Sequence, residues 1–152
     1  MSRAFVKEQE TVDELPERLI SEHPNLVTSA GLKQIEAEVA RFDAAHAAAQ
    51  AAGDREAMAA TARDLRYWST RLSTAELVRV PADGDHAHFG STVTIEREDG
   101  RRQTYRIVGE DEADPAKGSV SFVSPLACSL VGKGVGDTVK VAGADAEIVA
   151  IG

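Results

Sequence analysis

Two apolar seams of similar length, separated by a single glycine turn, constrain the fold of this chain more than any other feature. Along each seam, apolar or small residues recur at alternating steps of three and four, which is the spacing of one helix face. Thr28 and Ser29 suit a helix N-cap, and Gly53 suits the left-handed conformation at a helix end. The pattern predicts an antiparallel coiled-coil hairpin over residues 25–79. Its seams comprise Leu32, Ile35, Val39, Phe42, His46 and Ala49, then Met58, Thr61, Leu65, Trp68, Leu72 and Ala75.

The hydrophobic period changes from 3.6 to 2 after a polar stretch at residues 80–88, whose composition predicts a linker. Asp99-Gly100 is a strong hairpin-turn signal between two alternating runs. We therefore expect residues 89–152 to form a small antiparallel sheet domain with one short helix, so that the whole chain is of the α+β class. The expected strands and helix are 91–97, 103–108, 119–123, the helix 125–131, then 138–141 and 147–151.

Residues 1–24 form a separate N-terminal arm in which no hydrophobic period is sustained. Pro16 and Pro24 interrupt any long helix, so we expect the arm to be extended or disordered until it docks. In the alternative interpretation, Phe5 and the Leu19-Ile20 pair anchor the arm on a partner or on the body of the protein.

The formal net charge of −8 argues against independent binding of duplex DNA, because neutralising phosphates requires an excess of Lys and Arg. Residues 25–78 carry 6 basic and 7 acidic groups, whereas residues 1–24 carry 3 and 6 and residues 79–152 carry 8 and 12. Only the predicted hairpin is therefore nearly neutral. No apolar run is long enough for a membrane span, and no signal peptide is visible. The single cysteine, Cys128, is consistent with the reducing cytoplasm, which is the expected location.

Several short motifs in residues 89–152 fall in the order typical of one family. The motifs are Gly90-Ser91, Asp99-Gly100, Arg106-Ile107-Val108-Gly109, Asp111-Glu112, Ser124-Pro125-Leu126-Ala127 and Gly136-Asp137. With these motifs, this part of the chain resembles the C-terminal domain of the bacterial GreA/GreB transcript cleavage factors, and Asn25-Leu26-Val27-Thr28 before Gly31-Leu32 resembles the opening of that family's first helix. The resemblance covers residues 25–152 and implies an FK506-binding-protein-like fold for the second domain.

The resemblance implies a specific partner and a specific mode of action. Factors of this family dock their C-terminal domain on RNA polymerase at the rim of the secondary channel, and their hairpin enters the channel. They modulate the polymerase and are not enzymes by themselves, and they meet nascent RNA or DNA only within the polymerase complex. By the same resemblance, the docking residues of this chain are expected to be Asp111, Glu112, Ser124, Pro125, Leu126 and Ala127.

The predicted hairpin tip carries only part of the family's acidic pattern. Cleavage factors use a D-x-x-E pair at the tip to share a Mg²⁺ ion with the polymerase, and such an ion activates water for RNA hydrolysis. Asp54 matches the first acid, but Ala57 occupies the second position and Glu56 lies one residue early. Asp54 and Glu56 are therefore either weak shared Mg²⁺ ligands or a solvated helix start that complements the helix dipole. No stably bound cofactor is expected.

The predicted length of the hairpin also argues against cleavage. The run from Ser29 to Ala52 has 24 residues and spans roughly 36 Å. It is about two turns, or roughly 10 Å, shorter than the GreA/GreB pattern, as in the regulator of nucleoside diphosphate kinase. The leading interpretation is an elongation factor that acts through the secondary channel. The alternatives are an inhibitor or competitor of cleavage factors, and a protein-interaction module that dimerises through the hairpin.

Three arginines in the second half of the hairpin form a possible RNA-facing stripe: Arg55, Arg63 and Arg66. In the alternative interpretation they pair with Asp64, with Glu56 or with solvent. His46 lies on the apolar seam, where we expect a packed polar residue and not a metal ligand.

Overall fold

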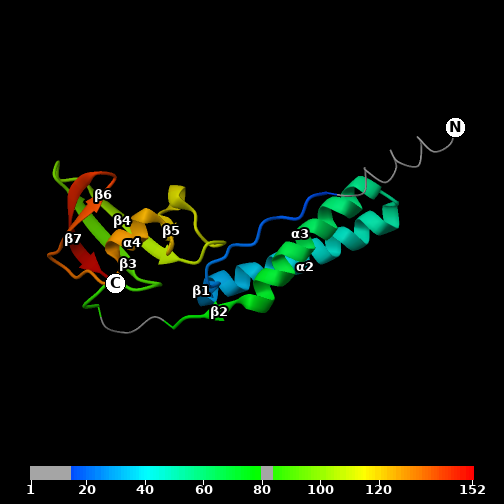
Figure 1. Cartoon of the computed structure of the whole chain (residues 1–152), viewed down its shortest axis with the longest axis horizontal. Helices are drawn as coiled ribbons and strands as arrows, with labels where there is room; N and C mark the ends of the chain where they lie inside the picture. Colours follow the sequence, from blue (N-terminus) through cyan, green and yellow to red (C-terminus); the bar gives the residue numbers. More distant parts are fainter. Residues whose placement is uncertain (1–14, 80–83) are drawn as a thin grey trace. The chain divides into compact units, whose positions relative to one another are not determined.

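The computed structural model describes residues 15–79 and 84–152. The chain divides into two compact units, which are described separately below (Figure 1). One unit contains the arm up to residue 22 together with residues 33–74, and the other contains residues 23–32 and 75–152. The predicted anchor at Phe5 lies outside the described residues. No helix in the described ranges is both long and apolar enough to cross a membrane.

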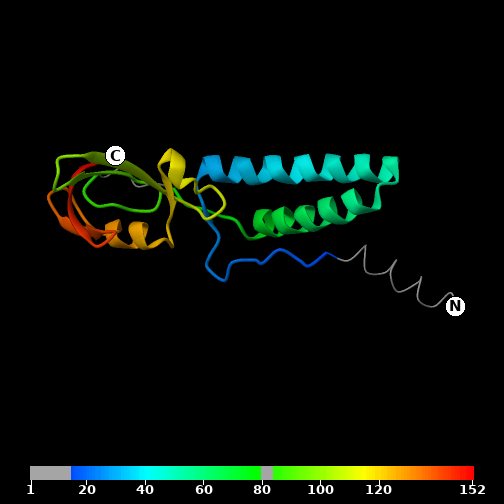
Figure 2. The same cartoon turned by 90° about the horizontal axis from the view of Figure 1, so that it is seen from above.

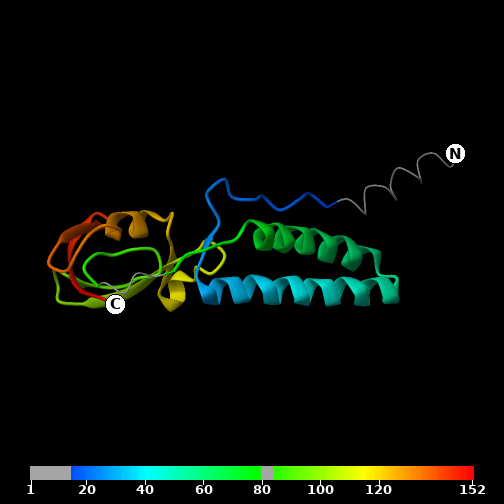
Figure 3. The same ribbon diagram turned by 90° about the horizontal axis from the view of Figure 1, so that it is seen from below.

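The predicted helical hairpin is confirmed. Helix α2 spans Ser29–Ala52 and helix α3 spans Arg55–Thr74, and the two lie side by side in all three views (Figure 1, Figure 2, Figure 3). Gly53 has a φ of 66°, and it donates to the Gln50 carbonyl while Asp54 donates to the Ala49 carbonyl. These two hydrogen bonds form a Schellman motif, which ends α2 and reverses the chain within two residues.

The interior of the hairpin differs from a uniformly packed apolar seam. Ile35 and Ala49 are buried, but so is Arg71, whose side chain is only 2% exposed. His46 Nδ1 lies 3.0 Å from Thr61 Oγ1, so the predicted packed polar histidine joins the two helices by a hydrogen bond. Sequence reasoning missed Arg71, because a periodicity argument assigns interior positions to apolar residues and has no signal for a buried charge.

The second unit contains a curled five-stranded sheet whose strand order is β5-β4-β3-β7-β6. Its strands and helices are β3 (Thr92–Arg97), β4 (Arg102–Val108), the 3₁₀ helix η1 (Pro115–Lys117), β5 (Ser119–Ser121), α4 (Pro125–Leu130), β6 (Thr138–Val141) and β7 (Ala144–Ile151). The α+β class with one short α-helix in this domain is confirmed. The sheet is not wholly antiparallel, however, because β5 pairs with β4 in parallel.

The core of this unit lies between the sheet and α4. Its buried side chains are Ala87, Val93, Ile95, Ile107, Val120, Ala127, Leu130, Val139, Val141, Ala146 and Ile148. Ala87 is fully buried and its N–H donates to the Lys133 carbonyl. The end of the stretch predicted as a linker is therefore part of the folded domain, although residues 80–83 lie outside the described ranges.

A short parallel pair, absent from the sequence prediction, adds residues 23–32 to this unit. Strand β1 (Leu26–Val27) pairs with β2 (Glu76–Leu77), while Asn25, Val27 and Thr28 are buried. The unit boundary consequently lies after Leu32, within α2, and differs from the predicted domain start at residue 89. Strands of two residues carry too little periodicity to be recognised from sequence.

Candidate functional site

A large apolar pocket of the β-sheet unit lies where β4, β5 and the start of α4 meet the end of β6. It has a volume of about 570 Å³, and three of the predicted docking residues, Ser124, Pro125 and Leu126, line it. Its other lining residues are Arg97, Tyr105, Ala113, Pro115, Val120, Ser121, Lys140, Val141 and Ala142. A concave apolar surface bordered by a few polar groups is the usual form of a binding site for an apolar side chain.

Helix α4 positions these residues through its N-terminal cap. The Ser124 hydroxyl accepts a hydrogen bond from the Ala127 N–H at 3.2 Å, and Pro125 occupies the first helical position, where no N–H is needed. Ala127 is fully buried in the core. The structure therefore places Ser124, Pro125 and Leu126 at the pocket, whereas the Ala127 side chain holds α4 against the sheet and is not available to a partner.

The other two predicted docking residues do not line this pocket. Asp111 is half-buried, and the Glu112 side chain is only 8% exposed. Glu112 Oε1 accepts a hydrogen bond from the Thr28 hydroxyl at 2.5 Å, and its Oε2 lies 3.5 Å from Arg106 Nη1. The carboxylate of Glu112 is thus engaged within the protein.

The hairpin tip shows a capping role for the first predicted metal ligand. Asp54 Oδ1 accepts a hydrogen bond from the Ala57 N–H at 3.1 Å, which makes Asp54 the N-cap of α3. Glu56 is exposed in the first turn of α3. Within the described ranges, no group of three or more His, Cys, Asp or Glu side chains could hold a metal ion. The geometry at Asp54 fits a helix start, where an acid also complements the dipole.

The three predicted RNA-facing arginines have separate surroundings. Arg66 pairs with Glu17 of the arm at 2.5 Å, and Arg63 lies 3.4 Å from Asp64. Arg55 lines a hollow of about 320 Å³ near the tip together with His46, Met58 and Ala59. The hydrogen bond from Arg66 lowers the pKa of the Glu17 carboxyl, so this pair persists at neutral pH and is lost only as the pH falls below the ordinary glutamate range.

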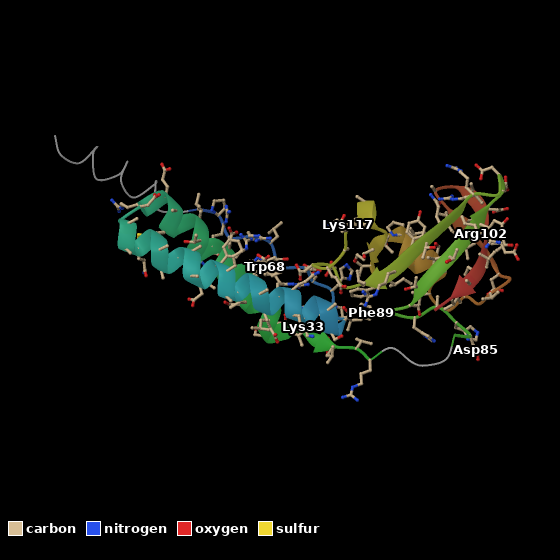
Figure 4. The ribbon with its side chains drawn as sticks, turned by 180° about the vertical axis from the view of Figure 1, so that it is seen from behind. Lys33, Trp68, Asp85, Phe89, Arg102 and Lys117 are labelled. Carbon is tan, nitrogen blue, oxygen red and sulfur yellow. The ribbon has the colours of Figure 1, made fainter. Side chains whose placement is uncertain are left out.

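The described part of the arm docks on the hairpin through charged side chains. Arg18 lies over the Tyr67 ring, 3.8 Å from its centroid, and its Nη1 is 3.2 Å from Asp64 Oδ1. Residues 15–22 run along the α3 side of the hairpin (Figure 2, Figure 3), close to Trp68, which is labelled in Figure 4. The described residues of the arm therefore contact the hairpin, but not through Leu19 and Ile20, which are 95% and 42% exposed. The predicted anchor at Phe5 stays a prediction.

We expect Arg18→Ala to destabilise the hairpin unit by about 1 kcal/mol, because it removes a cation–π contact and a partly buried ion pair together. Urea unfolding monitored by the fluorescence of Trp68, the single tryptophan, reports this change. The exposed Lys33 on α2 provides the matched control, since Lys33→Ala removes a cation that makes no such contact with residues 15–22, the described part of the arm. Equal midpoints for the two variants would contradict a stabilising role for the arm.

Comparison with known proteins identifies the family. The model described as "Transcription elongation factor, GreA/GreB, C-term" matches residues 82–151. The transcription elongation factor GreA of Desulfovibrio desulfuricans is 37% identical over 126 residues, which cover 82% of this chain and 74% of that protein. GreA of Brucella anthropi is 34% identical over 131 residues, covering 85% and 80%. The solved structure of Gfh1 from Thermus thermophilus covers 86% of this chain and 99% of its own at 19% identity, with a TM-score of 0.42.

The identities to full-length GreA proteins extend over both the hairpin and the sheet domain, and the family model matches the domain that carries the pocket. The chain therefore belongs to the GreA/GreB family of transcription elongation factors.

Proposed function

We propose that this protein binds RNA polymerase through the pocket beside α4 and regulates elongation through a hairpin inserted in the secondary channel. The observation that carries the proposal is the position of Ser124, Pro125 and Leu126 together on one apolar pocket in a member of the GreA/GreB family. The resemblance of these residues to the family's docking segment supports the same conclusion.

The chemistry of the pocket favours a protein partner over a nucleic acid. Tyr105, Val120 and Leu126 supply apolar surface, with Arg97 and Lys140 among the other lining residues. The chain as a whole is strongly acidic, with a net charge of −8. A duplex would be repelled by that charge, whereas an apolar side chain flanked by acidic groups would suit this lining. The same charge argument limits contact with nascent RNA to the polymerase complex.

The tip favours regulation without stimulation of transcript cleavage. Asp54 caps α3, and Ala57 stands at the position of the second acid. Helix α2 has 24 residues, so its length is roughly 36 Å and the tip lacks about two turns of reach relative to the cleavage factors. Carboxylates coordinate Mg²⁺ at 2.0–2.1 Å, and side chains cannot span a shortfall of that size. We therefore favour a factor that occupies the channel and competes with cleavage factors.

This function requires no catalytic activity of the protein alone and no stably bound cofactor. Any Mg²⁺ near Asp54 would be held chiefly by the polymerase. A hairpin-mediated homodimer is the competing function of another class. Gel filtration of the protein with and without core RNA polymerase distinguishes the two functions. A complex with polymerase supports the proposal, and a stable dimer that does not bind polymerase overturns it.

In stalled, backtracked polymerase complexes, we expect the protein to slow RNA synthesis without shortening the RNA and to reduce the cleavage stimulated by a GreA protein. Asp54→Asn should leave both effects unchanged, because Asn caps a helix as well as Asp does while removing the carboxylate. Gel analysis of labelled transcripts measures each effect. Shortened RNA that disappears in Asp54→Asn would show that the protein is a cleavage factor.

A further inference from the structure

We infer that Glu112 is a positioning residue that anchors the start of α2 on the β-sheet unit, and that it does not contact the partner directly. This inference rests on the proposed function, in which the pocket beside α4 binds RNA polymerase and the hairpin affects elongation. All the residues involved belong to the unit that contains residues 23–32 and 75–152.

The anchor begins with two hydrogen bonds at one hydroxyl group. Thr28 Oγ1 accepts from the Gly31 N–H at 3.0 Å and donates to Glu112 Oε1 at 2.5 Å. Thr28 is 3% exposed, so neither bond competes with much water. A buried hydrogen bond to a charged acceptor is stronger than one between neutral groups, and losing one partner leaves the other unsatisfied. Glu112 therefore completes the N-terminal cap of α2 from a distant part of the chain.

Gly31 shows that the carboxylate lies directly against the first turn of α2. A Cβ at this position would lie 2.7 Å from Glu112 Oε1, which is closer than a real side chain allows. The carboxylate also faces the N-terminal end of a 24-residue helix, where negative charge is favourable. Arg106, 3.5 Å from Oε2, supports it from β4.

The neighbouring backbone contacts restrict the same segment. A Cβ at Gly109 would collide with the Leu26 carbonyl oxygen, so the β1 backbone packs against the loop that carries Glu112. Pairing of β1 with β2 holds the other side of this segment. A change at Glu112 should therefore act on the first turn of α2 without altering the pocket, which Glu112 does not line.

The free protein provides the first test, with no polymerase present. Alanine favours helix over glycine, so Gly31→Ala should raise the Tm if Glu112 has no anchoring role. If the anchor exists, the new methyl group forces the carboxylate away from Thr28. We therefore expect the change in Tm caused by Gly31→Ala to be less favourable in the wild-type protein than in the Glu112→Ala variant, with a difference of about 3 °C or more. Equal shifts in both backgrounds overturn the anchor.

The second test separates affinity from hairpin action. Glu112→Ala and Thr28→Val should bind core RNA polymerase within about twofold of wild type, while their effect on elongation at saturating protein falls about fivefold or more. Thr28→Ser keeps both hydrogen bonds and should retain the effect, as should Glu36→Gln, which removes an exposed acid from α2. Amide exchange at residues 28–32 should increase only in the first two variants.

The outcomes distinguish the inference from the proposed function. Loss of polymerase affinity in Glu112→Ala but not in Thr28→Val would assign Glu112 to the docking surface and overturn the inference. Failure of the wild-type protein to bind polymerase overturns the proposed function, yet the Gly31 and Glu112 Tm comparison still decides whether the anchor exists.

Discussion

Replacing Ser124 with aspartate is expected to lower the affinity for core RNA polymerase about tenfold or more, which corresponds to roughly 1.4 kcal/mol. Aspartate is as good an N-cap as serine, so α4 should still form. Its charge, however, would stand at the rim of an apolar pocket and would lose water when a partner fills that pocket. Titration of labelled polymerase measures the change directly.

The matched control for this prediction is Ser124→Asn. Asparagine has nearly the same shape as aspartate and also caps helices, but it is neutral. We expect its affinity to stay within about threefold of wild type, a difference below roughly 0.7 kcal/mol. If both variants bind polymerase like the wild-type protein, the pocket beside α4 is not the docking surface.

Leu130→Ala should lower the free energy of unfolding of the β-sheet unit by about 2–5 kcal/mol, because Leu130 is fully buried between α4 and the sheet. The free energy of unfolding of most small domains is only about 5–15 kcal/mol, so this loss would be a large fraction of the stability of this unit. Hydrogen exchange of β3 and β7, measured by mass spectrometry, should report the loss. Polymerase binding should fall as well, since α4 carries Pro125 and Leu126.

The adjacent residue provides the control. Val131 is 44% exposed, and truncating an exposed side chain usually changes stability by less than about 0.5 kcal/mol. Val131→Ala should therefore leave exchange in β3 and β7 unchanged. A similar loss in both variants would mean that the C-terminal end of α4, and not burial of Leu130, governs the stability of this unit.

The hairpin was predictable because the sequence signals that specify it lie close together along the chain. A heptad seam, an N-cap and a glycine turn are each readable within a few residues, and α2 ends at Ala52, directly before Gly53. The strands β3 and β4 were predictable for the same reason, since Asp99-Gly100 separates two alternating runs. The residues at the pocket were named by resemblance, but no periodicity shows that Tyr105 and Val141 share that pocket with Leu126.

Local sequence patterns were enough to predict two helices joined at Gly53 and a small sheet domain, and the motifs in residues 25–32 and 90–137 were enough to indicate the family. The contacts of individual polar side chains became known only from the folded structure. Glu112 and Thr28 are 84 residues apart in the sequence, and Arg18 and Asp64 are 46 residues apart. Such pairs cannot be recognised from local sequence patterns, because the two side chains come into contact only when the backbone has folded. For the same reason, local patterns could not show that Ala127 lies in the core or that Glu112 lies against Thr28, whereas Asp54 caps α3 through an N–H only three residues away.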